Sequence, residues 1–550
     1  MRVIVSLFMF FLMGNYNVCM AQKEKPKLIV GIVVDQMRAD YLYRFANHYG
    51  ENGLKLLMNE GMNFQNCHYN FVPTFTGPGH ASIYTGTTPS NHGIVANSWW
   101  SKSENKRVNC VEDVHSLPIG SATDSKGNYS PVRLKSNTIT DQIKLMDSRS
   151  KVISISIKNR GAILPGGHAP DGVYWYDYAN GGFMTGSYYM NSLPNWVNEF
   201  NKKSNANFYL KDKWETLKPI ETYLESRADN YAYESSITDE APVFPYDLKK
   251  AIKNGKNKYD LFVHTPFANT LLTDFALSAM EHEQLGMDDV TDFLAISYSS
   301  PDIIGHSFGP YSKEMQDVMI RLDRDIEKLI TELNAQIGKD NYVLFLTADH
   351  AVEPIPQYLL DHKMAAGYFF WKPFSEHVKT SVAERFGANL ISDMYNYSIY
   401  LNDEQITLLE INKNEVISFV KQLVQNYPHI KQVYTAEELM QTNFVHEWSK
   451  KIALGFHPLE AGDILLTLEP GYLTVKEDTF KSKQGTSHGS AYNYDTQVPL
   501  LFYGKGISAL NVYEEVEITA ITPTLALLLG LTKPSGSTGD VLIPVLQGKK

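Results

Sequence analysis

Residues 25–42 read KPKLIVGIVVDQMRADYL, and this stretch decides the fold class. An apolar run leads into Asp35, and a polar turn and then a helical pattern follow it. A strand that is apolar on both faces is typical of a parallel sheet covered by helices. The stretch therefore predicts a buried strand with Asp35 at its carboxyl end.

Later parts of the chain repeat this pattern. Further buried strands are predicted in KVISISIKNRGAIL (151–164), DFLAISYSSPDIIGHSFGP (292–310), NYVLFLTADHAVEPIP (341–356) and TQVPLLFYGKGI (496–507). Residues 313–338 carry apolar residues at helical spacing and predict an amphipathic helix between two of these strands. Strand, helix and strand in this order predict an α/β fold with a largely parallel central sheet and helices on both faces.

Three regions interrupt the pattern. Residues 98–135 are polar and rich in turn formers, which predicts an inserted hairpin. Residues 166–250 are rich in Gly, Asn and Tyr, which favours a cap over the edge of the sheet. Residues 385–445 carry a strand and a helix of their own and predict a small α+β insertion. We expect one catalytic domain over residues 22–550 that contains all three.

The N-terminus has the pattern of a secretory signal. The stretch MRVIVSLFMFFLMGNYNVCMAQ (1–22) has a basic Arg2, a short apolar run and small residues near Ala21. We expect a signal peptide over residues 1–21 and a periplasmic or secreted protein. Cys19 raises the alternative of a lipoprotein, but residues 16–18 make a poor lipobox. No other stretch has the roughly 18 apolar residues that a membrane span needs.

Composition narrows the class further. The net charge of -11 and the pI near 5.8 argue against a nucleic-acid-binding role. Beyond the signal only Cys67 and Cys110 remain, and an oxidising compartment slightly favours a disulfide between them over two buried thiols. The sequence has no obvious assembly element, so we expect a monomer.

Charged residues gather at the predicted strand ends. In open parallel sheets, ligands bind outside the carboxyl ends of the strands. The residues placed there are Asp35, Asp302, His306, Asp349 and His350. If a helix begins at Pro301, Asp302 and His306 lie on the same side of it. The glycine-rich stretch KQGTSHGSAYNYD (483–495) adds His488.

Three aspartates and three histidines supply two sets of three metal ligands. Each residue alone is an ordinary cap or turn residue, and only their joint position at strand ends is unusual. Oxygen and imidazole ligands without a thiolate suit zinc, with manganese or iron as less favoured alternatives. Two metal ions about 4 Å apart can activate a nucleophile and stabilise a leaving oxygen in phosphoryl transfer. The sequence leaves open an additional structural calcium ion.

The stretch NFVPTFTGPGHASIYTG (70–86) crowds turn formers around Thr74 and Thr76 and then becomes apolar. One interpretation is a surface loop without a function. The other is a loop that presents a hydroxyl at the start of a helix.

These motifs together resemble the alkaline phosphatase superfamily. Within it the chain is similar to the exported bacterial alkaline phosphatases of the PafA type, and more distantly to the nucleotide pyrophosphatase/phosphodiesterases. The motifs that carry the resemblance are VVDQMRADYL (33–42), PTFTGPGHASIYTGTTPSNHGIVANSWW (73–100), IKNRGA (157–162), SPDIIGHSFGP (300–310), TADHAVEP (347–354) and GTSHGS (485–490). They span nearly the whole mature chain.

The resemblance implies a role for each site residue. Thr76 is the implied nucleophile, and Asn97, Lys158 and Arg160 are the implied ligands of the phosphoryl oxygens. One implied zinc site is formed by Asp302, His306 and His488, and the other by Asp35, Asp349 and His350 together with Thr76.

Lys158 and Arg160 discriminate between substrate classes. A phosphate monoester presents three non-bridging oxygens and about two negative charges, which two cations suit. If the strand stays regular, residues two apart share one side of it. The alternative is that both cations cap a strand end or pair with surface acids.

We therefore expect an exported phosphomonoesterase with two zinc ions and a phospho-threonine intermediate, acting on small phosphate monoesters. One alternative is a nucleotide pyrophosphatase or phosphodiesterase on the same scaffold. A remote alternative is a non-catalytic exported binding protein.

Overall fold

The computed structural model describes residues 24–548 apart from 122–127, 204, 212, 442–443, 445 and 476–483. The predicted signal peptide, residues 1–21, lies outside the described residues.

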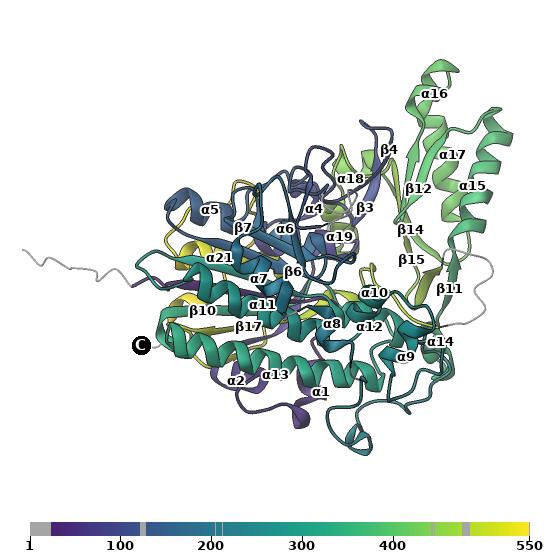
Figure 1. The fold of residues 1–550 in the computed structure, drawn as a ribbon. Helices are drawn as coiled ribbons and strands as arrows, with labels where there is room; N and C mark the ends of the chain where they lie inside the picture. The colour runs from purple at the N-terminus through teal and green to yellow at the C-terminus, as the bar shows by residue number, and fades with distance from the viewer. Residues whose placement is uncertain are drawn as a thin grey trace, which may run out of the picture.

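A large mixed sheet forms the centre of the molecule, with helices on both faces (Figure 1). Its strands follow in the order β18 (Leu510–Val512), β2 (Met62–His68), β17 (Gln497–Gly504), β10 (Tyr342–Thr347), β1 (Leu28–Val34), β9 (Asp292–Tyr298), β6 (Val152–Ser156), β7 (Gly172–Tyr176), β8 (Phe183–Gly186) and β5 (Pro118–Ile119). The five strands from β10 to β7 run parallel to one another. On either side of them, β17 and β8 run antiparallel. The predicted, largely parallel α/β architecture is confirmed.

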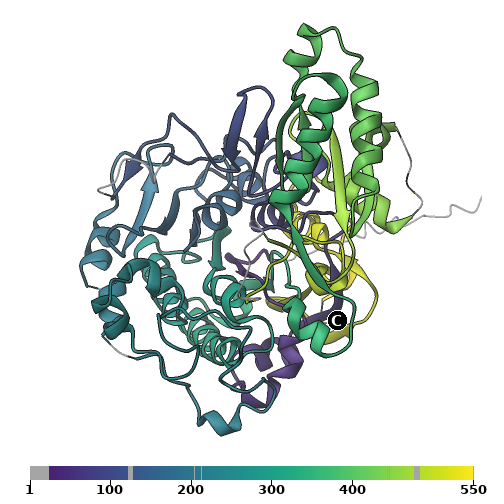
Figure 2. The same cartoon turned by 90° about the vertical axis from the view of Figure 1, so that its right-hand side faces the viewer.

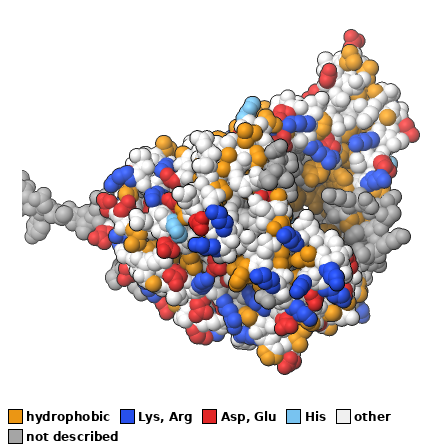
Figure 3. Space-filling model, viewed as in Figure 1, with side chains coloured by type: hydrophobic (Ala, Val, Ile, Leu, Met, Phe, Trp, Pro, Cys, Tyr) orange, Lys and Arg blue, Asp and Glu red, His pale blue; other side chains and the backbone are white. Residues whose placement is uncertain are grey.

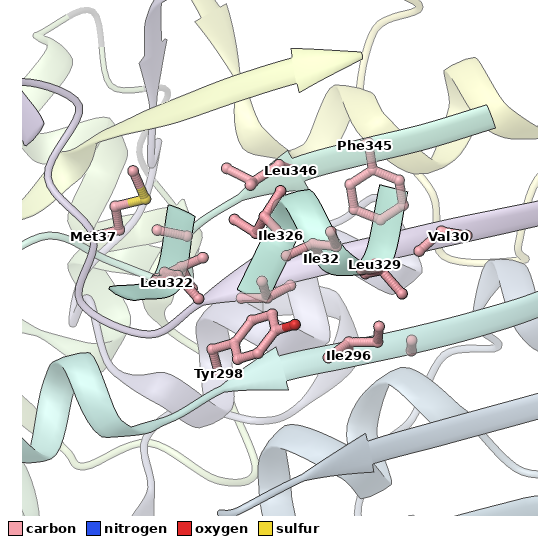
Figure 4. Packing of buried hydrophobic residues seen from close by; sticks show 14 of the residues in the cluster. Val30, Ile32, Met37, Ile296, Tyr298, Leu322, Ile326, Leu329, Phe345 and Leu346 are labelled. Carbon is pink, nitrogen blue, oxygen red and sulfur yellow. The ribbon is translucent and has the colours of Figure 1, made fainter. Parts of the chain in front are cut away.

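The central strands are fully buried because helices cover both of their faces. Every residue of β1, β9 and β10 is buried. The helix α13 (Lys313–Gln336) packs its apolar side, including Leu322, Ile326 and Leu329, against this part of the sheet (Figure 4). The helix α11 (Phe267–Glu283) lies beside α13. On the other face lie α5 (Ile139–Met146), α6 (Asn159–Gly166) and α21 (Ile521–Leu528).

Segments inserted between these elements extend the central sheet and form three smaller ones. Residues 98–109 form the antiparallel hairpin of β3 (Ser98–Ser101) and β4 (Lys106–Asn109). Residues 172–186 do not lie over the sheet edge, as a cap would; they supply β7 and β8 to the sheet itself. Consecutive apolar and aromatic residues in this stretch form buried strands. The sequence prediction missed these strands because the surrounding region is rich in Gly and Asn.

A small subdomain projects from the main body (Figure 2). It contains the sheet β12 (Ile391–Tyr395), β13 (Ser398–Leu401), β15 (Ile464–Leu468) and β14 (Ile430–Thr435), with α15 (Trp371–Phe386) and α17 (Lys413–Gln425). It has a hydrophobic core of its own. We call these elements the small subdomain below; they extend beyond residues 385–445 on both sides. None of the described helices combines the length and apolarity needed to cross a bilayer.

Candidate active site

The site lies at the carboxyl ends of four neighbouring parallel strands, β10, β1, β9 and β6. Val34 of β1 pairs with Tyr298 of β9, and Ser156 of β6 pairs with Ser297. The strands therefore end at the same level. The segments that follow them carry Asp35, Lys158, Asp302, Asp349 and His350, and all five meet at this edge. The helix α12 (Ser300–Phe308) places Asp302 and His306 four residues apart on one side, as predicted.

Two groups of side chains offer metal-ligand atoms within 4.8 Å of one another. One group is Asp302, His306 and His488, and the other is Asp35, Asp302 and His350. The first matches the implied zinc set. In the second, Asp302 takes the place of Asp349, and so Asp302 belongs to both groups. Asp349 lies close by, with Oδ2 3.6 Å from Nε2 of His350.

The three histidines are held in the tautomer that a metal ligand needs. In each, Nδ1 donates to a main-chain carbonyl: His306 to Thr486 at 2.8 Å, His488 to Thr74 at 2.7 Å, and His350 to Ala351 at 3.0 Å. A carbonyl oxygen can only accept, so Nδ1 carries the proton. In the neutral ring, Nε2 then keeps its lone pair for a metal ion.

Carboxylate oxygens at the same place are buried without a protein hydrogen-bond donor. Among the described residues, Oδ1 of Asp35 and Oδ2 of Asp349 are in this state. Buried anionic oxygens are normally paired or coordinated. Together with three imidazoles and no thiolate, this donor set fits two zinc ions.

Charge in the site is unbalanced without such ions. Burial and the neighbouring Asp302 raise the pKa of Asp35 to about 6. Burial and Asp35 raise the pKa of Asp349 well above its usual value. Burial also disfavours the Asp302 carboxylate, but His306 and Lys158 outweigh it and hold its pKa well below the usual range. Burial, with His488 beside it, lowers the pKa of His350 and keeps that ring neutral.

Thr76 begins the helix α3 (Thr76–Thr85) and faces this cluster. Its hydroxyl oxygen lies 3.5 Å from Nε2 of His350 and 3.5 Å from Nη2 of Arg160. The helix approaches closely because residue 79 is glycine: a Cβ there would lie 2.2 Å from the backbone oxygen of Asp349. The turn formers of the 70–86 stretch thus position a hydroxyl.

Asn97 holds the residue after Thr76. Its side-chain oxygen accepts a 2.7 Å hydrogen bond from the backbone N–H of Gly77. A side chain at Gly77 would be tight, because a Cβ would lie 3.2 Å from this same oxygen and 3.1 Å from the sulfur of Cys110.

Lys158 and Arg160 reach the site by a different route from the one predicted. The strand β6 ends at Ser156, Lys158 caps the helix α6, and Arg160 lies in its first turn. The prediction that they share one side of a strand is therefore wrong, because the chain turns into a helix between them. Lys158 nevertheless pairs with Asp35 at 2.6 Å and with Asp302.

The predicted disulfide is also wrong. Cys67 and Cys110 are both free and buried. Cys67 lies on β2 in the core of the main sheet, whereas Cys110 lies in a separate apolar cluster around the β3–β4 hairpin.

Two residues of the site were missed from the sequence. Gln36 follows Asp35 in a left-handed conformation (φ 67°) and donates to Asp349 through its backbone N–H and to Asp302 through its amide. His80 donates to the backbone oxygen of Thr76, and burial lowers its pKa to about 3. The spacing of four from Thr76 could have indicated His80; no pattern marks Gln36.

Comparison with known proteins agrees with this geometry. Residues 29–491 match the family model of type I phosphodiesterase / nucleotide pyrophosphatase. The chain is 38% identical to alkaline phosphatase PafA of Elizabethkingia meningoseptica over 95% of each chain. It is 40% identical to a protein of Myroides odoratus named calcium-transporting ATPase, over 98% of this chain and 97% of the relative. A crystal structure of wild-type PafA superposes with a TM-score of 0.90, covering 95% of this chain and 99% of that one.

The fold and the site thus define a hydrolase of the alkaline phosphatase superfamily. The chain belongs to the type I phosphodiesterase / nucleotide pyrophosphatase family, and it is an enzyme of the alkaline phosphatase type. The predicted superfamily, fold and enzyme class are confirmed.

Proposed function

We propose that the protein is an exported alkaline phosphatase that hydrolyses small phosphate monoesters through a phospho-threonine on Thr76. The observation that carries this proposal is the position of Arg160, whose guanidinium lies 3.5 Å from the Thr76 hydroxyl. A phosphoryl group at this hydroxyl would meet a planar cation that can bind two of its oxygens.

The choice of monoesters over diesters rests on two cations at one place. Lys158 lies within ion-pair distance of Asp35, and the Arg160 guanidinium lies 3.5 Å from the Thr76 hydroxyl. A monoester carries about two negative charges, and replacing one of its non-bridging oxygens by an ester removes one charge and one acceptor. The family model covers enzymes that cleave diesters, so family membership alone does not decide the substrate class.

The reaction follows from the arrangement of the protein groups. The Thr76 oxygen attacks phosphorus as the bond to the leaving alkoxide breaks, and water later attacks the phospho-threonine to release phosphate and restore the hydroxyl. Asn97 fixes the backbone of Gly77 and so the start of α3, which keeps the Thr76 hydroxyl aimed at the site. Lys158 and Arg160 hold the phosphoryl oxygens and stabilise the charge on them.

Two zinc ions would be held by Asp302, His306 and His488, and by Asp35, Asp349 and His350, with the Asp302 carboxylate also close enough to serve the second ion. When bound, they supply Lewis-acid chemistry that favours the ionised hydroxyl and neutralises charge on the leaving oxygen. The carboxylate oxygens without donors and the fixed Nε2 lone pairs support this assignment. The signal-like residues 1–21 support export.

The test compares catalytic efficiency on an aryl phosphate monoester and on the matching diester, with zinc-loaded wild-type protein and Arg160→Ala. We expect a large monoester preference that falls in the variant because one oxygen contact is lost. A diester preference that is indifferent to Arg160→Ala would assign the protein to the phosphodiesterases.

ATP belongs in the same assay because one relative is named an ATPase. Its terminal phosphoryl group also carries about two charges and one bridging oxygen, so the same cations suit it. We expect Arg160→Ala to lower efficiency on ATP and on the aryl monoester by similar factors.

A further inference from the structure

A second cavity lies behind the catalytic loops, where the small subdomain meets the main body. Its walls come from Val72 before the nucleophile, Trp99 of the hairpin, Leu465 of β15 and the chain that follows His488. The volume of the cavity is about 60 Å³, and the cavity opens to solvent. Figure 3 shows the surface hollowed between the main body and the projecting subdomain, with hydrophobic side chains inside.

Aromatic rings form much of the wall. Trp448 and Tyr492 meet edge to face with ring centroids 4.6 Å apart, and Tyr492 stacks on Tyr494 at 5.4 Å. Trp99 lies on the same cavity and is itself buried. Such a wall takes an apolar body, and its ring faces attract a cation.

Besides its aromatic and aliphatic side chains, the wall carries three carboxyl groups, those of Glu353, Glu469 and Asp495, and the first and last of these are buried. Glu353 is 4% exposed and Asp495 is 0% exposed. Among the described residues, Oε1 of Glu353 and Oδ1 of Asp495 have no hydrogen-bond donor. The other oxygen of Asp495 accepts from the backbone N–H groups of Gly489 and Ser490 at 3.0 and 2.8 Å. Asp495 is thus held in place with one oxygen left over.

Neither carboxyl group has a cationic partner strong enough to offset its burial. Burial and the nearby Asp495 raise the pKa of Glu353 well above its usual value, and burial raises that of Asp495 to about 7. A ligand with N–H donors and a positive charge would supply what both oxygens lack. A bare metal ion fits less well, because the carboxyl oxygens without a hydrogen-bond donor on this wall, one of Glu353 and one of Asp495, offer too few ligands.

We propose that this cavity binds a small organic amine in its ammonium form, with the N–H groups on Glu353 and Asp495 and the apolar body among Trp448, Tyr492 and Tyr494. This second site does not depend on the proposed function, since none of its ligand-binding groups contacts the phosphoryl site. His488 contributes to the cavity wall, so the ligand lies against the loop that holds this histidine.

The test is calorimetric titration of zinc-loaded wild-type protein with benzylammonium chloride, with benzyl alcohol as the neutral analogue of the same shape. We expect a Kd of about 1 mM or tighter for the ammonium and at least about tenfold weaker binding of the alcohol. Equal binding of the two, or no binding of the ammonium at about ten times that concentration, would overturn the proposal.

Volume-matched variants test whether the ammonium group binds at Glu353 and Asp495. Glu353→Gln and Asp495→Asn preserve volume, and Asn keeps an oxygen for Gly489 and Ser490. Each should weaken ammonium binding by about tenfold, whereas Asp325→Asn, which alters a buried acid on α13, should bind like the wild type. If either pocket variant fails to fold, a crystal of the wild type soaked in 4-bromobenzylammonium decides. An anomalous bromine peak in the cavity supports the site, and only water there refutes it.

Discussion

The side-chain oxygen of Asn97 lies 2.7 Å from the backbone nitrogen of Gly77, the residue that follows Thr76. The Asn97 oxygen therefore sets the start of α3, and in the proposed mechanism its NH₂ group is left to bind the phosphoryl oxygens.

Asn97→Asp separates these two roles. Aspartate keeps an oxygen for Gly77 but replaces the NH₂ donor by a negative charge. We expect a loss of about 100-fold in kcat/KM with a nearly unchanged Tm. Asn97→Ala should lose activity and also lower the Tm, because the Gly77 N–H loses its partner. Near-wild-type activity of Asn97→Asp would contradict the phosphoryl contact.

Thr76→Ala should abolish turnover while zinc content and Tm stay as in the wild type, because Thr76 begins α3 with no side-chain cap to lose. Thr76→Ser is the matched control and should keep measurable activity. Phosphate release by zinc-loaded protein and metal analysis of the same samples measure both effects. Residual turnover in Thr76→Ala comparable to that of Thr76→Ser would remove the nucleophile assignment.

Asp302 belongs to both groups of metal-ligand atoms, whereas His306 belongs to one. Asp302→Ala should therefore reduce zinc content at both sites, and His306→Ala at one. Metal analysis after dialysis against a zinc buffer tests this difference. Equal zinc content in the two variants would contradict the shared carboxylate.

Gly79→Ala should lower the Tm and the affinity for zinc, because its Cβ would lie 2.2 Å from the backbone oxygen of Asp349. Gly50→Ala is the control, since the nearest atom to its Cβ, at 3.3 Å, is the flexible end of Glu327. Thermal unfolding with and without zinc measures the effect. A Gly79→Ala protein as stable as the control would show that α3 can move without disturbing Asp349.

Asp325 on α13 predicts a pH dependence of stability. Burial raises its pKa from 3.8 to about 8. The folded state then holds a proton that the unfolded state has lost, so the contribution of Asp325 to stability falls as pH rises from about 4 to about 8. Asp325→Asn should flatten the decline of the free energy of unfolding in this window, measured by urea titration at several pH values. An unchanged slope would show that Asp325 ionises normally.

The strands and the site edge were predictable because they depend on local pattern. A long apolar run that ends in an acid is buried on both faces, as in a parallel sheet covered by helices. The positions of Asp35, Asp302 and Asp349 at the carboxyl ends of such strands followed from this pattern. The sequence could not show that Cys67 and Cys110 stay unpaired, because that depends on the distance between two separate cores. In the second group of metal-ligand atoms, Asp302 takes the place predicted for Asp349. This difference depends on side-chain conformations that shift the carboxylate oxygens by a few ångströms, which the sequence does not reveal.

Gln36 shows a further limit. Its role comes from a left-handed backbone that directs one amide to Asp302 and the backbone N–H to Asp349. Nothing in the neighbouring residues requires that conformation, which the packing of the surrounding loops imposes. The prediction that Lys158 and Arg160 share one side of a strand was wrong for a related reason. The sequence only weakly determines the residue at which a strand ends and a helix begins.

The carbonyl anchors of the three imidazoles affect how the site tolerates mutation. The acceptors at positions 74, 351 and 486 belong to the main chain, so exchanging those side chains leaves the acceptor atoms in place. A substitution at one of these positions would change local packing, and at Thr74 or Thr486 also a side-chain hydrogen bond, but the acceptor of the ring nitrogen would stay in place. A family built this way can diversify the surroundings of its metal centre without rebuilding the centre.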